Sequence, residues 1–179
     1  MRALLLISGL LFSFSLFAVD VPLKPSPLPT AKDVDVARYI GKWYVISSLP
    51  QFFTRNCEGQ TAEYGIVNEK IISVHNVCYK ENGKTKDIRG KGVIQDAPNN
   101  ARLIVTFDNF WTRLFRVKGE YVIIKLGEGY DTVMVGSTNR KSLWIMSRQP
   151  TMDPTTLMEY KNLAHDLSFP VTQLQNSKY

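Results

Sequence analysis

Gly41-Lys42-Trp43-Tyr44 is the stretch from which the rest of the chain is interpreted, because a proline-rich segment ends there and strand-like segments begin. Gly41 can adopt backbone angles that other residues avoid, so the chain can turn sharply at this point. Trp43 is a large flat side chain with a single N–H group, which suits it to plug the end of a small barrel. A Gly-x-Trp motif arises often by chance, so its meaning depends on the segments that follow it.

Segments with the composition of β-strands follow this motif as far as Ser147. They are rich in β-branched and aromatic residues, and turn-forming residues such as Asn68-Glu69 separate them. Eight antiparallel strands in up-and-down order can close into a barrel without free edges, and such a barrel can hold one small ligand. We expect strands at Lys42 to Ser48, Gln60 to Val67, Lys70 to Tyr79, Lys86 to Ile94, Arg102 to Phe107, Phe115 to Leu126, Tyr130 to Ser137 and Ser142 to Ser147.

A helical pattern replaces the strand pattern after Pro150. Asp153 is a good N-cap, and Pro154 suits the first helical position. Apolar residues then recur at helical spacing as far as Leu167, which predicts one helix with a single apolar face. We expect this helix to pack against the outside of the barrel.

Two segments precede the predicted barrel. Residues 1–18 begin with a positive charge at Arg2, continue as a mostly apolar run and end on a small residue, which predicts a signal peptide. An uncleaved anchor is the alternative, but the apolar run is short for a membrane-spanning helix. Residues 19–36 contain four prolines and are expected to form an extended tether, so the folded domain spans residues 37–179.

The net charge of +6 and the pI of about 9.3 allow contact with nucleic acid or with an anionic membrane surface. The basic residues are scattered, however, and do not alternate with aromatic residues, so nucleic acid is not an expected partner. Peripheral contact with anionic lipid remains an expectation from charge alone. A transmembrane barrel would need a continuous apolar outer band, and the polar run from Lys86 to Lys91 argues against one.

The Gly-x-Trp motif, the series of strand-like segments, the Arg that ends Leu143-Trp-Ile-Met-Ser-Arg148 and the single helix together resemble the lipocalin family. Within it the chain is similar to the bacterial outer-membrane lipocalins and to apolipoprotein D, from about Val36 to the end. The resemblance implies an all-β fold, an eight-stranded up-and-down antiparallel β-barrel with one C-terminal α-helix packed outside. It also implies a structural signature in which Arg148 lies across Trp43 beside Gly41, a cation–π contact of about 0.5–2 kcal/mol.

The resemblance implies binding, storage or transport of a hydrophobic small molecule, with a fatty acid or lysophospholipid as the expected ligand. Aromatic side chains would contact the acyl chain, while amide and hydroxyl groups would orient a polar head. A single bulge would turn any of these residues outward, which is the alternative for each. The residues at or near cavity-lining positions of the family are Tyr64, Asn76, Phe107, Tyr121 and Trp144. The loop Gln51-Phe52-Phe53 either covers the pocket mouth or packs on the barrel rim.

Bacterial members of the family often carry a lipidated Cys just after the leader, and this sequence has no Cys before Cys57. We therefore expect export without an N-terminal lipid, to the periplasm or cell envelope or into the medium. An even number of cysteines in an exported protein favours a disulfide between Cys57 and Cys78. Two free thiols or a metal pair are the alternatives, although only His75 lies near enough to help bind a metal.

Catalysis is not expected from this sequence, and neither is a metal or a cofactor. His75 and His165 are the only histidines, and no nucleophile or ligand set is placed beside them. Two alternatives stay open because some lipocalins have these functions. One is an enzyme that acts on a pocket-bound lipid or isoprenoid through the thiol of Cys57 or Cys78. The other is a carrier of haem or another tetrapyrrole that is bound through His75.

Overall fold

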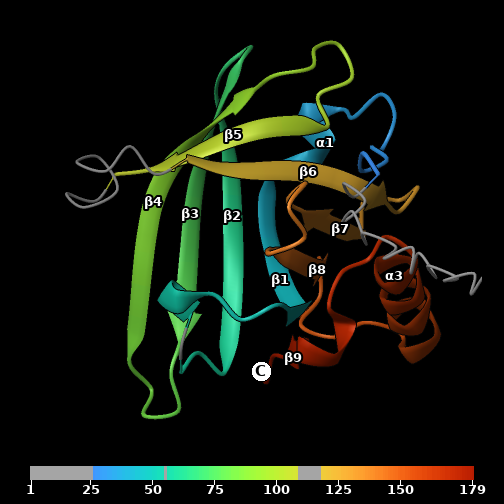
Figure 1. Cartoon of the computed structure of the whole chain (residues 1–179). Helices are drawn as coiled ribbons and strands as arrows, with labels where there is room; N and C mark the ends of the chain where they lie inside the picture. Colours follow the sequence, from blue (N-terminus) through green and yellow to red (C-terminus); the bar gives the residue numbers. More distant parts are fainter. Residues whose placement is uncertain (1–25, 55, 109–117) are drawn as a thin grey trace, which may run out of the picture.

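The computed structural model describes residues 26–54, 56–108 and 118–179 (Figure 1). Within these residues one antiparallel sheet has the strand order β2-β3-β4-β5-β6-β7-β8-β1-β9, and β1 also pairs with β2. The first eight strands therefore close into a barrel, which confirms the predicted fold class. The strands are β1 Gly41–Ser48, β2 Gly59–Asn68, β3 Ile71–Tyr79, β4 Thr85–Ile94, β5 Arg102–Phe107, β6 Lys118–Leu126, β7 Thr132–Gly136, β8 Leu143–Ser147 and β9 Gln175–Asn176.

Most strand boundaries lie close to those predicted, and one differs for a clear reason. The predicted seventh strand begins at Tyr130, whereas β7 begins at Thr132. Tyr130 has a φ of 59°, and its amide donates a hydrogen bond to the carbonyl of Gly127 at 2.8 Å, so it belongs to the turn before the strand. Residues 115–117 of the predicted sixth strand lie outside the described residues.

The helix α3 (Pro154–Asp166) packs against the outer surface of the barrel, beside β6, β7 and β8 (Figure 1). The side chain of Asp153 accepts a hydrogen bond from the amide of Thr156 at 2.8 Å, so the predicted N-cap is present. Tyr160 and Ala164 are buried in an apolar layer against outward-facing residues of the strands. The barrel wall between the helix and the interior is thus apolar on both faces.

The described part of the proline-rich segment, residues 26–36, lies against the barrel. It forms no strand, but Leu28 and Val34 are each only 2% exposed. The amide of Ala31 donates to the carbonyl of Ile123 at 2.9 Å, and Arg102 donates to the carbonyl of Leu28 at 3.0 Å. The short helix α1 (Val36–Tyr39) follows and leads into β1 at the same end of the barrel. The predicted signal peptide, residues 1–18, lies outside the described residues.

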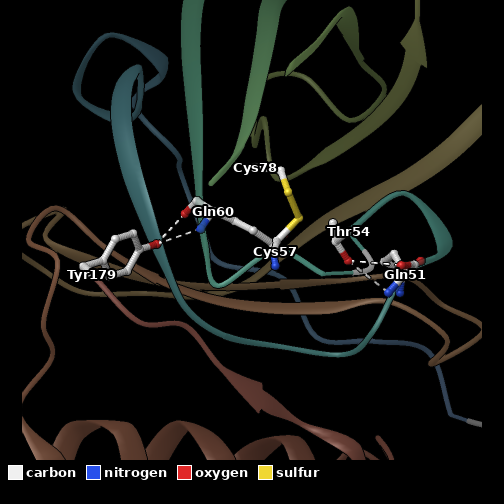
Figure 2. Close-up of a disulfide and its surroundings, with 6 residues drawn as sticks. All are labelled: Gln51, Thr54, Cys57, Gln60, Cys78 and Tyr179. Atoms are coloured by element: carbon white, nitrogen blue, oxygen red, sulfur yellow. Dashed lines mark hydrogen bonds between the residues drawn. A yellow bond between two sulfur atoms is a disulfide. The ribbon is translucent and has the colours of Figure 1, made fainter. Parts of the chain in front are cut away.

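The last residues of the chain occupy the place where β1 and β2 separate. β1 pairs with β2 over residues 41–44, whereas Ser47 and Ser48 pair with β9. The Tyr179 hydroxyl lies between the carbonyls of Val45, at 2.9 Å, and Gln60, which share its single proton, and it accepts a hydrogen bond from the amide of Gln60 at 3.3 Å (Figure 2). The seam between the two strands is therefore bridged by the C-terminal segment.

Candidate functional site

One end of the barrel is closed by the residues of the opening motif. Gly41 has a φ of 94°, a left-handed conformation that favours glycine, so the expected sharp turn is present. Trp43 is fully buried, and its indole N–H donates to the carbonyl of Tyr39 at 2.9 Å. Arg148 lies over the indole, with its Cζ atom 3.8 Å from the ring centroid, as the resemblance implied.

Arg148 also binds main-chain oxygens that converge on this end of the barrel. Its guanidinium donates to the carbonyls at the end of α1 and at the start of β1, and to one carbonyl of the turn before β7. The distances are 2.8 Å to Arg38, 2.9 Å to Tyr39, 2.9 Å to Ile40, 2.9 Å to Lys42 and 3.2 Å to Tyr130. The charge is thereby fully engaged in closing the barrel and is not presented to the interior.

Three buried tyrosines form the floor of the interior above this plug. The hydroxyls of Tyr39 and Tyr121 are 2.5 Å apart, and the Tyr121 hydroxyl donates to that of Tyr64 at 2.9 Å. Because the single proton of Tyr121 is given to Tyr64, Tyr39 must be the donor in the other hydrogen bond. Burial raises the pKa of Tyr64 to about 12 and raises the pKa of Tyr39 and of Tyr121 well above the ordinary value. All three phenols are therefore neutral at physiological pH.

The other predicted cavity residues lie nearer the open end and also face inward. Asn76 stands opposite Ala62 and two positions from buried Val74, so the alternation of β3 directs it into the barrel. Phe107 and Trp144 pack on the interior apolar cluster and are only half-buried. The Asn76 Oδ1 atom is buried and has no hydrogen-bond partner among the described residues.

The loop after β1 reaches the open end of the barrel, where the 3₁₀ turn η1 (Phe52–Thr54) lies. The rings of Phe53 and Phe107 are 6.2 Å apart, so this loop contacts an inward-facing residue. A disulfide between Cys57 and Cys78 joins the loop to β3, as predicted, with Cα atoms 5.3 Å apart (Figure 2). The aromatic loop is thus fixed beside the barrel mouth.

The histidines lie outside the barrel, and the two cysteines are joined to each other. His75 lies on the outer side of β3, with Nε2 3.0 Å from Asp87 and Nδ1 4.0 Å from Glu63. His165 is on the exposed side of α3 and contacts its neighbour Asp166. Both cysteine sulfurs are joined, so neither is a free thiol. Over residues 26–54, 56–108 and 118–179, no group of three or more metal-binding side chains occurs.

Tyr39 is not among the residues that the sequence predicted to line the cavity, although it contacts two of them. Its hydroxyl meets that of Tyr121, which is 82 residues away in the chain. Tyr39 lies on α1, Tyr64 on β2 and Tyr121 on β6, so their hydroxyls meet only once the barrel has closed. No local pattern around Tyr39 signals this contact.

A closed barrel with one outer helix, a tryptophan plug and an arginine laid across it defines the class of proteins called lipocalins. The family model described as a lipocalin-like domain matches residues 34–178, and the chain belongs to this family. Members of the family bind hydrophobic small molecules and are in general binding and transport proteins. In the part of the chain that the structure describes, no helix has the length and apolar character needed to cross a membrane.

The outer membrane lipoprotein Blc of Vibrio cholerae is 30% identical over 152 residues, which cover 84% of this chain and 85% of the relative. Blc of Escherichia coli K12 is 29% identical over 174 residues, 97% of this chain and 95% of the relative. Apolipoprotein D of Bos taurus is 28% identical and covers 78% of this chain and 73% of its own. Among solved structures, insecticyanin of Manduca sexta shares the fold with a TM-score of 0.66 at 18% identity, covering 87% of this chain and 85% of its own.

Proposed function

We propose that this lipocalin binds a fatty acid or a lysophospholipid in its barrel and stores or transports it. The observation that carries this proposal is a gradient of burial along the inward-facing side chains. Trp43 and Val133 are fully buried at the closed end, whereas Phe107 and Trp144 are half-buried near the open end. Part of the aromatic surface of Phe107 and of Trp144 is thus exposed near the open end.

An acyl chain suits this surface because its binding is driven by apolar burial. Each buried CH₂ contributes roughly 0.8 kcal/mol, before the costs of association are subtracted. The neutral side chains of Tyr64 and Asn76 face the interior as well and can orient a polar group of the ligand. The similarity to Blc, whose name places it at an outer membrane, supports a lipid as the ligand.

We propose export to the periplasm or cell envelope, or secretion, without an N-terminal lipid. The relatives named Blc are lipoproteins, whereas the first cysteine of this sequence is Cys57, whose sulfur is engaged in the disulfide. A disulfide persists in an oxidising compartment, which supports export. The net charge of +6 supports peripheral contact with anionic lipid head groups during ligand exchange.

Native mass spectrometry of the purified protein, followed by extraction of bound lipid, tests the proposed function. We expect a co-purifying fatty acid or lysophospholipid, and its loss in the variants Trp144→Asp and Phe107→Asp. Thr106→Asp is the matched control, because Thr106 precedes Phe107 on β5 and therefore faces outward. An empty barrel that takes up no member of a panel of acyl lipids would show that the proposal is wrong.

A further inference from the structure

The wall of the barrel has a seam between β1 and β2 where the two strands stop pairing. Their ladder covers only residues 41–44 of β1 and ends at the pair of Tyr44 with Thr61. Val45 and Gln60 would form the next pair, but they do not pair with each other. On its other edge β1 stays paired with β8 as far as Ser48. The half of β1 that approaches the open end therefore has no direct bond to β2.

Residues 175–179, which we call the strap, bridge this seam. The main chain of the strap donates to β1 on one side and to the residue before β2 on the other. The amide of Ser177 donates to the carbonyl of Ile46 at 3.0 Å, and the amide of Lys178 donates to the carbonyl of Glu58 at 2.7 Å. The strap thus replaces the direct ladder between the two strands.

A single hydroxyl of the strap binds the two residues that would form the next pair of the ladder. The Tyr179 hydroxyl lies between the carbonyls of Val45 and Gln60, and it accepts a hydrogen bond from the amide of Gln60 at 3.3 Å (Figure 2). The ring of Tyr179 lies edge-on to that of Tyr44, with centroids 5.3 Å apart. Tyr44 alternates with inward-facing Trp43 and therefore faces outward, so the strap covers the seam from outside.

The seat of the strap is rigid, whereas the strap itself is exposed. A Cβ atom at Gly59 would lie 2.8 Å from the carbonyl oxygen of Lys178 and 3.0 Å from the ring of Tyr179, so any side chain there would displace the strap. Cys57, two residues before Gly59, is bonded to Cys78 of β3, which fixes the start of β2 (Figure 2). Tyr179 is 53% exposed, so the strap is the part of the seam that can move.

The seam gives access to the same interior as the barrel mouth. Val45, which stands at the seam, belongs to the interior apolar cluster on which Trp144 packs. At the mouth, the loop after β1 holds Phe53 with its ring 6.2 Å from that of Phe107, and the disulfide fixes this loop. Parting β1 from β2 would therefore open the interior sideways without moving the fixed loop.

We propose that the strap is a gate whose release parts β1 from β2 and lets an acyl ligand pass sideways through the barrel wall. This inference rests on the proposed lipid binding and adds the route of the ligand and its control. The strap lies on the outer face and touches the ligand neither before nor after binding. Its release therefore changes the rates of association and dissociation by the same factor and leaves the affinity unchanged.

Stopped-flow measurement of a fluorescent fatty-acid analogue tests the gate. In Tyr179→Phe both rates should rise about tenfold, because phenylalanine cannot bind the main-chain groups of Val45 and Gln60. Gly59→Ala should raise both rates as well, since it displaces the strap. Tyr160→Phe is the matched control: it removes a tyrosine hydroxyl that donates to Thr132 at 3.0 Å on the side covered by α3, and it should change neither rate.

Hydrogen exchange of the ligand-free protein tests the strap independently of any ligand. The amide of Gln60 donates to the Tyr179 hydroxyl, so it should lose protection in Tyr179→Phe and in Gly59→Ala. Amides in the ladder between β3 and β4 should keep their protection in both variants, because the strap does not contact that ladder.

Three results would overturn the gate. The first is unchanged protection of the Gln60 amide in both variants. The second is lost protection with unchanged rates, which would show that the seam opens without admitting the ligand. The third is a weaker affinity at an unchanged association rate, which would show that the strap shapes the pocket. If the wild type takes up no analogue, the proposed lipid binding fails and the route fails with it, whereas normal affinity with unchanged rates refutes the gate alone.

Discussion

Arg148→Ala is expected to lower the free energy of unfolding by about 3–5 kcal/mol. Three of its hydrogen bonds, to the carbonyls of Tyr39, Ile40 and Tyr130, are partly buried. At about 1 kcal/mol net for each bond they contribute roughly 3 kcal/mol. The two exposed bonds add little, because water replaces them. The contact with Trp43 at 3.8 Å adds about 0.5–2 kcal/mol.

Urea denaturation of the oxidised protein, followed by tryptophan fluorescence, measures this loss as a shift of the midpoint at constant slope. Arg148→Lys keeps the charge but replaces a planar group that has five donors. It should therefore lower the free energy of unfolding by about half as much as Arg148→Ala does. Arg89→Ala is the control, because its side chain is 69% exposed and its neighbour Asp87 is 3.8 Å away. A loss below about 1 kcal/mol for Arg148→Ala, or one equal to that of the control, would refute the assigned role.

Three further perturbations have expected outcomes. The double variant Cys57→Ser with Cys78→Ser should have a free energy of unfolding about 3 kcal/mol lower in urea denaturation, because the disulfide closes a loop with a sequence separation of 21. The pKa of Tyr64 is raised to about 12, so its phenol stays neutral in the folded protein at pH values where it ionises in the unfolded chain. The free energy of unfolding should therefore fall by roughly 2–3 kcal/mol between about pH 10 and 12, and it should fall less in Tyr64→Phe. Gly90→Ala should lower the thermal midpoint, at a cost of about 1–3 kcal/mol, because a Cβ atom would lie 2.2 Å from a main-chain oxygen of β5. A Cβ atom at Gly119 would lie 3.9 Å from the main-chain oxygen of Val105, so Gly119→Ala should have little effect on the thermal midpoint.

The strands, the outer helix and the plug could be predicted because each has a local signal. Alternation of apolar residues marks the strands, Asp153-Pro154 marks the start of α3, and Gly41 with Trp43 marks the turn into the barrel. The disulfide between Cys57 and Cys78 followed from the even count of cysteines in a sequence with a predicted signal peptide. These inferences need only neighbours in sequence or one turn between strands.

The hydrogen-bonded floor and the docked segment before α1 could not be predicted in the same way. Tyr39, Tyr64 and Tyr121 come from three separate elements, and only the closed barrel brings their hydroxyls together. Residues 26–36 read as a tether from their prolines, yet the amide of Ala31 binds β6 through the carbonyl of Ile123. Such contacts depend on the diameter and tilt of the barrel, which no short stretch of sequence encodes.

Closure of the barrel has a consequence for how the chain folds. β1 must pair with β8, and Arg148 must reach the carbonyl of Ile40 across a sequence separation of 108. The hairpins β2–β3 and β3–β4 join neighbours and can form early, whereas the seam between the first and last strands carries the largest loop-closure entropy. We therefore expect closure to be the slow step, on the millisecond-to-second scale typical of barrels rich in non-local contacts. The barrel can therefore close only after residue 148 has been synthesised, so a ribosome-bound chain shorter than this has no complete interior in which to hold a ligand.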